Sequence, residues 1–202
     1  MDQKIAVLGA GSIGSSFAAD LTDAGLDVTI IDQWPAHVDV MKNKGLDITM
    51  PDLHLQVPVT AWHMCELAEH MPQFDIVFLA VKSYDTAWLT QLIEPYLKAD
   101  GVLIGVQNGM NNETISDIIG TDRTIGCAVE LSAEIFTPGV VKRDTTRSGT
   151  WFGIGELDGS FTPRLKGVRE IMENVAKITL TENIEGAKWT KLIANTMTMG
   201  PI

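Results

Sequence analysis

The chain has 202 residues, 45% of them hydrophobic, and a formal net charge of −11 at pH 7. This length suits one large domain, or one domain and part of another, and so acidic a surface repels polyanions, which excludes nucleic acid as an expected partner. The two cysteines, Cys65 and Cys127, are too few and too far apart for a disulfide framework or a metal-binding pattern, so no metal is expected.

The N-terminus, MDQKIAVLGAG, enters a strand at once and leaves no room for a signal peptide. No apolar run approaches the roughly 20 residues that span a bilayer, so we expect a cytoplasmic protein with no membrane partner. The elements predicted in the first third of the chain are a strand at 5–8, a helix from the glycines at 9–14 to Gly25, a strand at 28–31, a helix at 35–44, short edge strands and turns at 46–60, and a helix at 65–70.

The same alternation continues through the middle of the chain. The next elements are a strand at 75–81, a helix with the apolar stripe Trp88, Leu92, Ile93 and Tyr96, a strand at 102–106, a helix at 112–119 and a strand at 124–129. A strand-rich stretch at 136–154 with turns at 138–139 and 149 follows, then a helix at 163–175, a strand at 178–180 and a helix from about 185. Strands that alternate with helices in this way predict an α/β fold with a doubly wound parallel sheet.

Three glycines, Gly9, Gly11 and Gly14, have the spacing G-x-G-x-x-G between a buried strand and an amphipathic helix. In this context, the first glycine permits a tight turn, the second leaves room for a diphosphate, and the third allows helix and strand to pack closely. The simpler alternative is a tight turn alone. We expect a dinucleotide to bind at the start of the helix, on the loop formed by Gly9, Ala10, Gly11, Ser12, Ile13 and Gly14.

Asp32 ends the second strand, 18 residues beyond Gly14, where an acid accepts hydrogen bonds from the adenosine ribose. A 2′-phosphate there would meet like charge, at a cost of about 1–4 kcal/mol per unit charge, and residues 33–36 include no Lys or Arg to offset it. The cofactor is therefore predicted to be NAD(P), with NAD preferred over NADP. The alternative role of Asp32 is that of a solvated turn residue before Pro35.

Four polar residues follow strands or share a helix stripe. Lys82 and Asn108 each come directly after a buried strand, where ligands bind in such sheets, although a solvated lysine and an Asn-Gly turn are the simpler explanations. Lys191 and Asn195 lie four residues apart on one helix stripe. The neighbouring stripe that we expect to pack consists of Trp189, Leu192, Ile193, Thr196 and Met197.

Four blocks, KIAVLGAGSIG, LAVKSYDT, QNGMNNE and KWTKLIANTM, occur in this order, and together the chain resembles the ketopantoate reductases (2-dehydropantoate 2-reductases). The resemblance implies a Rossmann-type dinucleotide-binding domain at 1–180 and the start of a C-terminal all-helical domain at 181–202, with the active site in the cleft between them. It also implies an oxidoreductase of pantothenate biosynthesis that reduces a small 2-oxo acid to the 2-hydroxy acid, and it leaves room for a homodimer.

By position, the resemblance implies a role for each candidate residue. Lys191 matches the catalytic lysine that polarises the keto oxygen and donates the proton, and Asn195 matches a substrate-binding asparagine. Lys82 matches a cofactor-binding residue, and Asn108 matches one that contacts both cofactor and substrate. Ser132 falls near a further cofactor contact.

The chain departs from the family pattern at two places. Met199-Gly200-Pro201 stands where many members have a second asparagine and proline, and Asp32 stands where many have a basic residue. An NAD-dependent D-2-hydroxy acid dehydrogenase of the D-mandelate type is therefore an alternative, as are another Rossmann dehydrogenase (3-hydroxyacyl or opine type) and a non-catalytic NAD-binding regulatory module. Family members also continue beyond residue 202, so we expect this chain to bind cofactor with little turnover.

Overall fold

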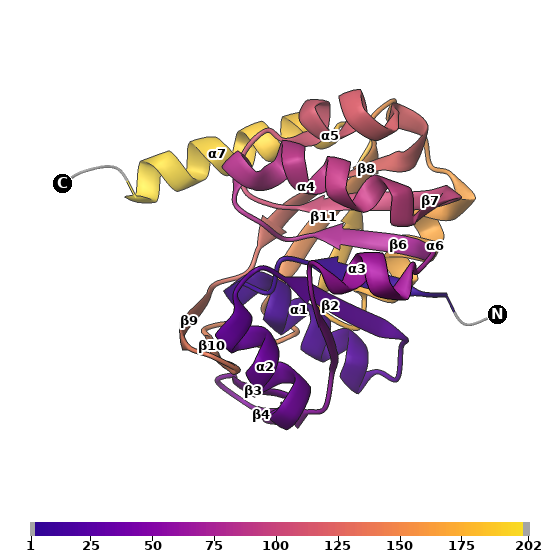
Figure 1. Cartoon of the computed structure of the whole chain (residues 1–202). Coiled ribbons are helices and arrows are strands. Elements are labelled where there is room, and N and C mark those ends of the chain that lie inside the picture. Colours follow the sequence, from indigo (N-terminus) through magenta and orange to yellow (C-terminus); the bar gives the residue numbers. More distant parts are fainter. Residues whose placement is uncertain (1–2, 200–202) are drawn as a thin grey trace.

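Eight strands form a sheet that is parallel except for one pair (Figure 1). The computed structural model describes residues 3–199. The strand order is β12-β11-β8-β7-β6-β1-β2-β5. The pairing of β8 with β11 is antiparallel, so β11 and β12 run opposite to the other six strands. The bounds are β1 Ile5–Leu8, β2 Val28–Asp32, β5 Thr60–His63, β6 Phe74–Leu79, β7 Leu97–Val106, β8 Thr124–Glu130, β11 Trp151–Glu156 and β12 Lys177–Leu180.

Helices cover both faces of this sheet, which confirms the predicted doubly wound α/β architecture. The strand β1 shows why: Ile5 and Val7 face one apolar cluster with α1, α2 and α6, whereas Ala6 and Leu8 face a second cluster with α3, α4 and α5. The helices are α1 Ser12–Asp23, α2 Pro35–Lys44, α3 Glu66–His70, α4 Thr86–Ile93, α5 Asn112–Ile119, α6 Pro163–Met172 and α7 Ile184–Met199, with short 3₁₀ turns at Ser83–Asp85, Glu94–Tyr96 and Thr121–Arg123.

A second, smaller sheet joins two segments that are far apart in the sequence. Its order is β4-β3-β10-β9, with bounds β3 Leu46–Thr49, β4 His54–Val57, β9 Ala133–Thr137 and β10 Val140–Arg143. The parallel pairing of β3 with β10 makes the join. The sequence predicted short strands in both segments but not that these strands pair in one sheet.

A buried ion pair fixes this sheet to α1. Arg143 and Asp20 both have fully buried side chains, and Arg143 Nη1 donates to Asp20 Oδ2 at 2.5 Å. Burial raises the pKa of Asp20, and the charge of Arg143 opposes that rise. Arg147 also donates to Asp20, at 2.7 Å. Removing Asp20 would leave the buried Arg143 charge without this ionic partner, so the pair couples α1 to the second sheet.

One predicted apolar stripe is largely confirmed and the other is wrong. In and just after α4, Ile93 is buried and Leu92 and Tyr96 pack partly buried against the core, whereas Trp88 is 40% exposed and its indole donates to the Asp85 carboxylate. In α7 the expected packing residues Trp189, Ile193 and Met197 are exposed. This helix contacts β8 and β11 through a different side, and it extends away from the sheet towards the C-terminus (Figure 1).

Candidate functional site

One cavity lies where the winding direction of the large sheet reverses. From β1 the chain proceeds to β2 and β5 on one side, and then returns to β6 on the other side of β1. Loops at the carboxyl ends of the strands separate at such a point and leave a crevice. The cavity, of about 270 Å³, is lined by Gly9, Gly11, Ser12, Ile13, Asp32, Gln33, Ala80, Val81, Lys82, Ser83, Tyr84, Asp85, Val106, Gln107 and Asn108.

The three glycines of the loop between β1 and α1 each meet a different steric demand. Gly9 has φ of +96°, and a Cβ on it would overlap Val81. A Cβ on Gly14 would overlap the carbonyl oxygen of Gly9, so the helix approaches the strand too closely for any side chain. Gly11 is exposed and lines the cavity, and a Cβ added to it would meet no neighbouring protein atom within 4 Å. The space above Gly11 is therefore open to a ligand.

The start of α1 offers backbone donors to this cavity. Gly11 is the N-cap residue, and no side chain caps the helix. The first N–H groups of a helix lack partners within the helix and favour an anion. Ser12 and Ile13, the first helical residues, line the cavity beside Gly11. These residues fit a diphosphate group.

Asp32 is hydrogen-bonded to the glycine loop and also lines the cavity. It is 9% exposed, its Oδ2 accepts from the amide of Ala10 at 2.5 Å, and its Oδ1 accepts from the amide of Trp34 at 2.7 Å. Each carboxylate oxygen has a second lone pair for a ligand hydroxyl. Asp32 therefore combines the ligand position predicted from the sequence with a structural role that the sequence did not reveal.

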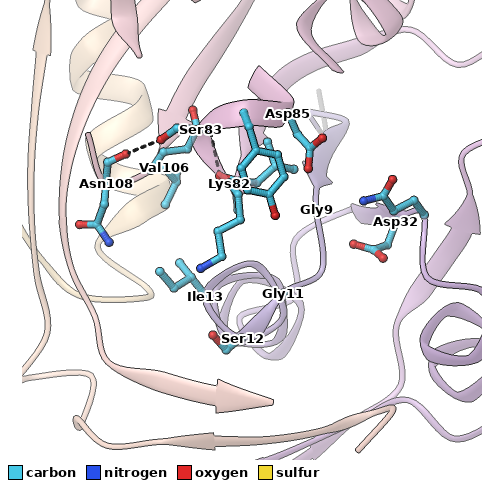
Figure 2. A pocket seen from close by; sticks show the side chains of 15 residues that line it. Gly9, Gly11, Ser12, Ile13, Asp32, Lys82, Ser83, Asp85, Val106 and Asn108 are labelled. Carbon is cyan, nitrogen blue, oxygen red and sulfur yellow. Dashed lines mark hydrogen bonds between the residues drawn. The ribbon is translucent and has the colours of Figure 1, made fainter. Parts of the chain in front are cut away.

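The charged residues at the cavity are divided between its two ends (Figure 2). The Lys82 ammonium points towards Ser12 and Ile13 at the start of α1, whereas Asp32 and Asp85 lie on the other side, near Gly9. Asp85 is oriented by the indole of Trp88, whose Nε1 donates to its Oδ1 at 2.7 Å. The cavity is thus cationic near the helix start and anionic beyond it.

A second, smaller cavity adjoins the first and contains the predicted catalytic residues. It is lined by Gln107, Asn108, Gly109, Ala128, Val129, Lys188, Lys191, Leu192 and Asn195. Gln107 and Asn108 line both cavities, so the two spaces meet at the end of β7. The structure therefore brings Asn108, Lys191 and Asn195 together, as the sequence predicted, and places Lys82 in the neighbouring cavity.

Lys191 lies near the carboxylate of Glu130. Its Nζ lies 3.9 Å from Glu130 Oε1, and its side chain is 26% exposed. Glu130 ends β8 and is more exposed than Lys191. The ammonium of Lys191 is thus half-buried at the cavity with one loose ionic partner.

Lys188 is a buried residue that the sequence did not single out. It is 4% exposed, and its Nζ donates to the carbonyl oxygens of Gln107 at 3.3 Å and Cys127 at 3.0 Å. Burial lowers its pKa, against smaller effects of Cys127 and Glu185 that raise it. Its spacing of three residues from Lys191 in KWTK was the available signal, because residues three apart share a helix face.

Gln107 was also missed, and it connects the loops around the cavities. Its side chain is 4% exposed, and Nε2 donates to the carbonyl of Val81 and to the hydroxyl of Thr86. These bonds hold the loop after β6, which carries Lys82, against the end of β7. The sequence signal was a glutamine directly before Asn108 in the block QNG, at the end of a predicted strand.

Other expected contacts fall elsewhere. Ser132 lines neither cavity, and its hydroxyl donates to Asp144 where β9 begins and β10 ends. Gly200 and Pro201 lie outside the described residues, and nothing is described of the Met199 side chain. Within residues 3–199, no cluster of three or more His, Cys, Asp and Glu could hold a metal ion, and no helix has the length and apolarity to cross a membrane.

The fold and the two cavities define an α/β protein of the doubly wound, Rossmann type. The family described as ketopantoate reductase PanE/ApbA matches residues 5–156. The chain is 33% identical to 2-dehydropantoate 2-reductase of Pyrococcus abyssi over 95% of this chain and 61% of that protein, and 31% identical to the enzyme of the same name from Pyrococcus horikoshii over 95% and 60%. This chain belongs to the ketopantoate reductase family, as its sequence blocks predicted.

Solved structures confirm the fold at lower sequence identity. D-mandelate dehydrogenase with NADH and anilino(oxo)acetate superposes with a TM-score of 0.86 at 23% identity, over 95% of this chain and 61% of that one. A 2-dehydropantoate 2-reductase from Geobacter metallireducens gives 0.85 at 22% identity, over 95% and 62%. The chain thus spans about three fifths of the length of these relatives.

Proposed function

We propose that this chain binds a nicotinamide dinucleotide in the larger cavity and a small 2-oxo acid where that cavity meets the smaller one, for reduction to the 2-hydroxy acid. The observation that carries the proposal is the junction of the two cavities at Gln107 and Asn108, with Lys191 and Asn195 on α7 lining the smaller one. A cofactor and a substrate bound in adjoining spaces have their reacting ends at that junction. The names of the relatives, 2-dehydropantoate 2-reductase and D-mandelate dehydrogenase, support this substrate class.

The larger cavity has the groups that a dinucleotide needs. The amides around Gly11 and the Lys82 ammonium suit the diphosphate, and Asp32 suits the adenosine ribose. We propose that NAD is preferred over NADP, because Asp32 and Asp85 both line the anionic end. A 2′-phosphate in contact with such a carboxylate is disfavoured by about 1–4 kcal/mol per unit charge.

When bound, the reduced nicotinamide supplies a hydride to the keto carbon. The proposed part of Lys191 is to donate a hydrogen bond to the keto oxygen, to stabilise the negative charge that grows there, and to transfer a proton to it. A cation placed at that oxygen acts mainly on the transition state, where the charge is largest. Asn108 and Asn195 are proposed to orient the substrate through their side-chain amides.

Two alternatives differ in a testable way. A D-2-hydroxy acid dehydrogenase would use the same cavities with a bulkier, more apolar acid. A non-catalytic NAD-binding module would use the larger cavity alone and would have no need of Lys191 beside Asn195.

The experiment titrates the chain with NADH and NADPH by calorimetry, and then adds 2-dehydropantoate or phenylglyoxylate to the NADH complex. We expect NADH to bind more tightly, and one of the acids to change the fluorescence of the bound NADH in a saturable manner. Absence of binding of both nicotinamides would refute the proposal. Binding of NADH without a response to either acid would favour the non-catalytic module.

A further inference from the structure

A chain of hydrogen bonds runs from the second sheet to the diphosphate loop through two buried residues. The amide of Gly139 donates to His37 Nδ1 at 2.9 Å, and His37 Nε2 lies 3.1 Å from Ser15 Oγ. Ser15 Oγ in turn donates to the carbonyl oxygen of Ala10 at 2.8 Å. His37 and Ser15 are both 0% exposed.

The direction of each bond follows from the donors and acceptors present. Because the amide of Gly139 can only donate, Nδ1 of His37 must carry its lone pair, which places the proton of the neutral ring on Nε2. That Nε2–H donates to Ser15, whose hydroxyl is then free to donate to Ala10. Burial lowers the pKa of His37 and outweighs two effects that raise it, the charge of Asp32 and a hydrogen bond with the Ala10 backbone, so the ring is held in its neutral form.

The hydrogen bond from Ser15 to the Ala10 carbonyl fixes the orientation of the Ala10–Gly11 peptide, which lies beside the cavity. In a trans peptide the C=O and the following N–H point in opposite directions. Fixing the carbonyl of Ala10 therefore fixes the direction of the Gly11 N–H, at the residue whose open side faces the cavity. The amide of Ala10 is held separately by Asp32.

We propose that His37 and Ser15 are positioning residues for diphosphate binding: through the Ala10 carbonyl they hold the Ala10–Gly11 peptide with its N–H aimed into the cavity. Gly139, in the turn between β9 and β10, is the outer support, and its own carbonyl accepts from the amide of Asp47 on β3. The second sheet thereby stabilises the cofactor loop without contacting the ligand. This inference rests on the proposed binding of a dinucleotide.

The chain offers a matched pair of variants one residue apart. Ser15→Ala removes the link, whereas Ser16→Ala removes a hydroxyl that is equally buried but has no hydrogen-bond partner among the described residues. We expect Ser15→Ala to weaken ADP-ribose binding about tenfold, the effect of one lost hydrogen bond in a buried site, and to change adenosine binding less than twofold. Ser16→Ala should leave both affinities within twofold of the wild type.

The same comparison shows what would overturn the inference. Equal losses of affinity in Ser15→Ala and Ser16→Ala, or an equal loss of affinity for ADP-ribose and adenosine in Ser15→Ala, would mean a general loosening of the structure. Either result would refute the proposed hydrogen-bond relay from Gly139 through His37 and Ser15 to Ala10. Failure of the wild-type chain to bind ADP-ribose would instead refute the proposed dinucleotide site, and the relay's role with it. Folded fractions are checked by thermal unfolding of each variant.

A spectroscopic measurement tests the relay independently of these variants. The ¹⁵N shifts of His37 in the ligand-free protein, assigned by their loss in His37→Asn, should show a protonated Nε2 and an unprotonated Nδ1. The opposite tautomer, or a doubly protonated ring at pH 7, would contradict the bond order that the relay requires.

Discussion

Replacing Gly11 with alanine should abolish tight cofactor binding without unfolding the protein. The backbone of Gly11, with φ of −63° and ψ of −173°, is one that any residue adopts, and an added Cβ would meet no protein atom within 4 Å. Because the methyl group would fill only the cavity, we expect the free energy of unfolding to change by less than about 1 kcal/mol, from opposing effects of capping and chain entropy.

The loss of affinity can be estimated from the bonds at stake. A methyl group above the loop would hold a diphosphate away from the amides of Gly11 and Ser12. Hydrogen bonds to a charged group contribute about 1.5–3 kcal/mol each, so the loss of two amounts to roughly 3–6 kcal/mol. This corresponds to a Kd for NADH about 10²–10⁴ times that of the wild type.

Gly14→Ala is the contrasting variant. Its Cβ would overlap the carbonyl oxygen of Gly9, so the helix or the strand must shift. We expect a lower Tm in Gly14→Ala and an unchanged Tm in Gly11→Ala, measured by thermal unfolding beside calorimetric titration with NADH. Binding within threefold of the wild type in Gly11→Ala would show that the diphosphate does not lie on this loop.

Three further outcomes follow from the charges and burial of individual side chains. Lys191→Ala should remove the saturable effect of the 2-oxo acid on the fluorescence of bound NADH, because the ammonium that binds the keto oxygen is lost, with the Kd for NADH within twofold; an unchanged response would show that Lys191 does not contact the acid. Asp85→Asn retains an acceptor for Trp88 while removing a charge, so paired titrations should show roughly fivefold tighter NADPH binding and unchanged NADH binding, and a parallel change in both would contradict the electrostatic explanation. Ellman's reagent should label one thiol in the folded protein, the exposed Cys65, and two after denaturation, because burial raises the pKa of Cys127 to about 12; rapid labelling of both in the folded state would contradict that burial.

Two helices with local signals begin and end close to where the sequence predicts them. The sequence predicts helices at 35–44 and 112–119, and α2 and α5 have those bounds. Both signals are local, since Pro35 fixes the first helical position of α2 and the glycines at 45 and 120 follow the last helical residues. The glycine loop was predictable for the same reason, because its spacing and flanks lie within a dozen residues.

Features that depend on distant partners were not predictable. The pairing of β3 with β10 joins segments some ninety residues apart, and no local pattern specifies such a register. The role of His37 depends on Gly139 and Ser15 together, and each of these alone is an ordinary residue of a helix or a turn. Periodicity was misleading in α7, because it identifies an apolar side but not the side that faces the sheet.

Lys188 on α7 occupies a buried position where an apolar residue could be buried at a lower cost in free energy. At neutral pH the buried ammonium of Lys188 lowers stability, because its pKa in the fold is below the usual 10.5 and the unfolded chain binds the proton more tightly. The free energy of unfolding therefore rises with pH between the lowered pKa and about 10.5.

An apolar substitute would remove that cost and leave the carbonyls of Gln107 and Cys127 buried without this donor. A buried carbonyl left without any donor costs about 1–3 kcal/mol. The ends of β7 and β8 thus need a long donor on the facing helix turn, and Lys188 meets this need. The same contact anchors the helix turn before Lys191, which lines the smaller cavity together with Asn108.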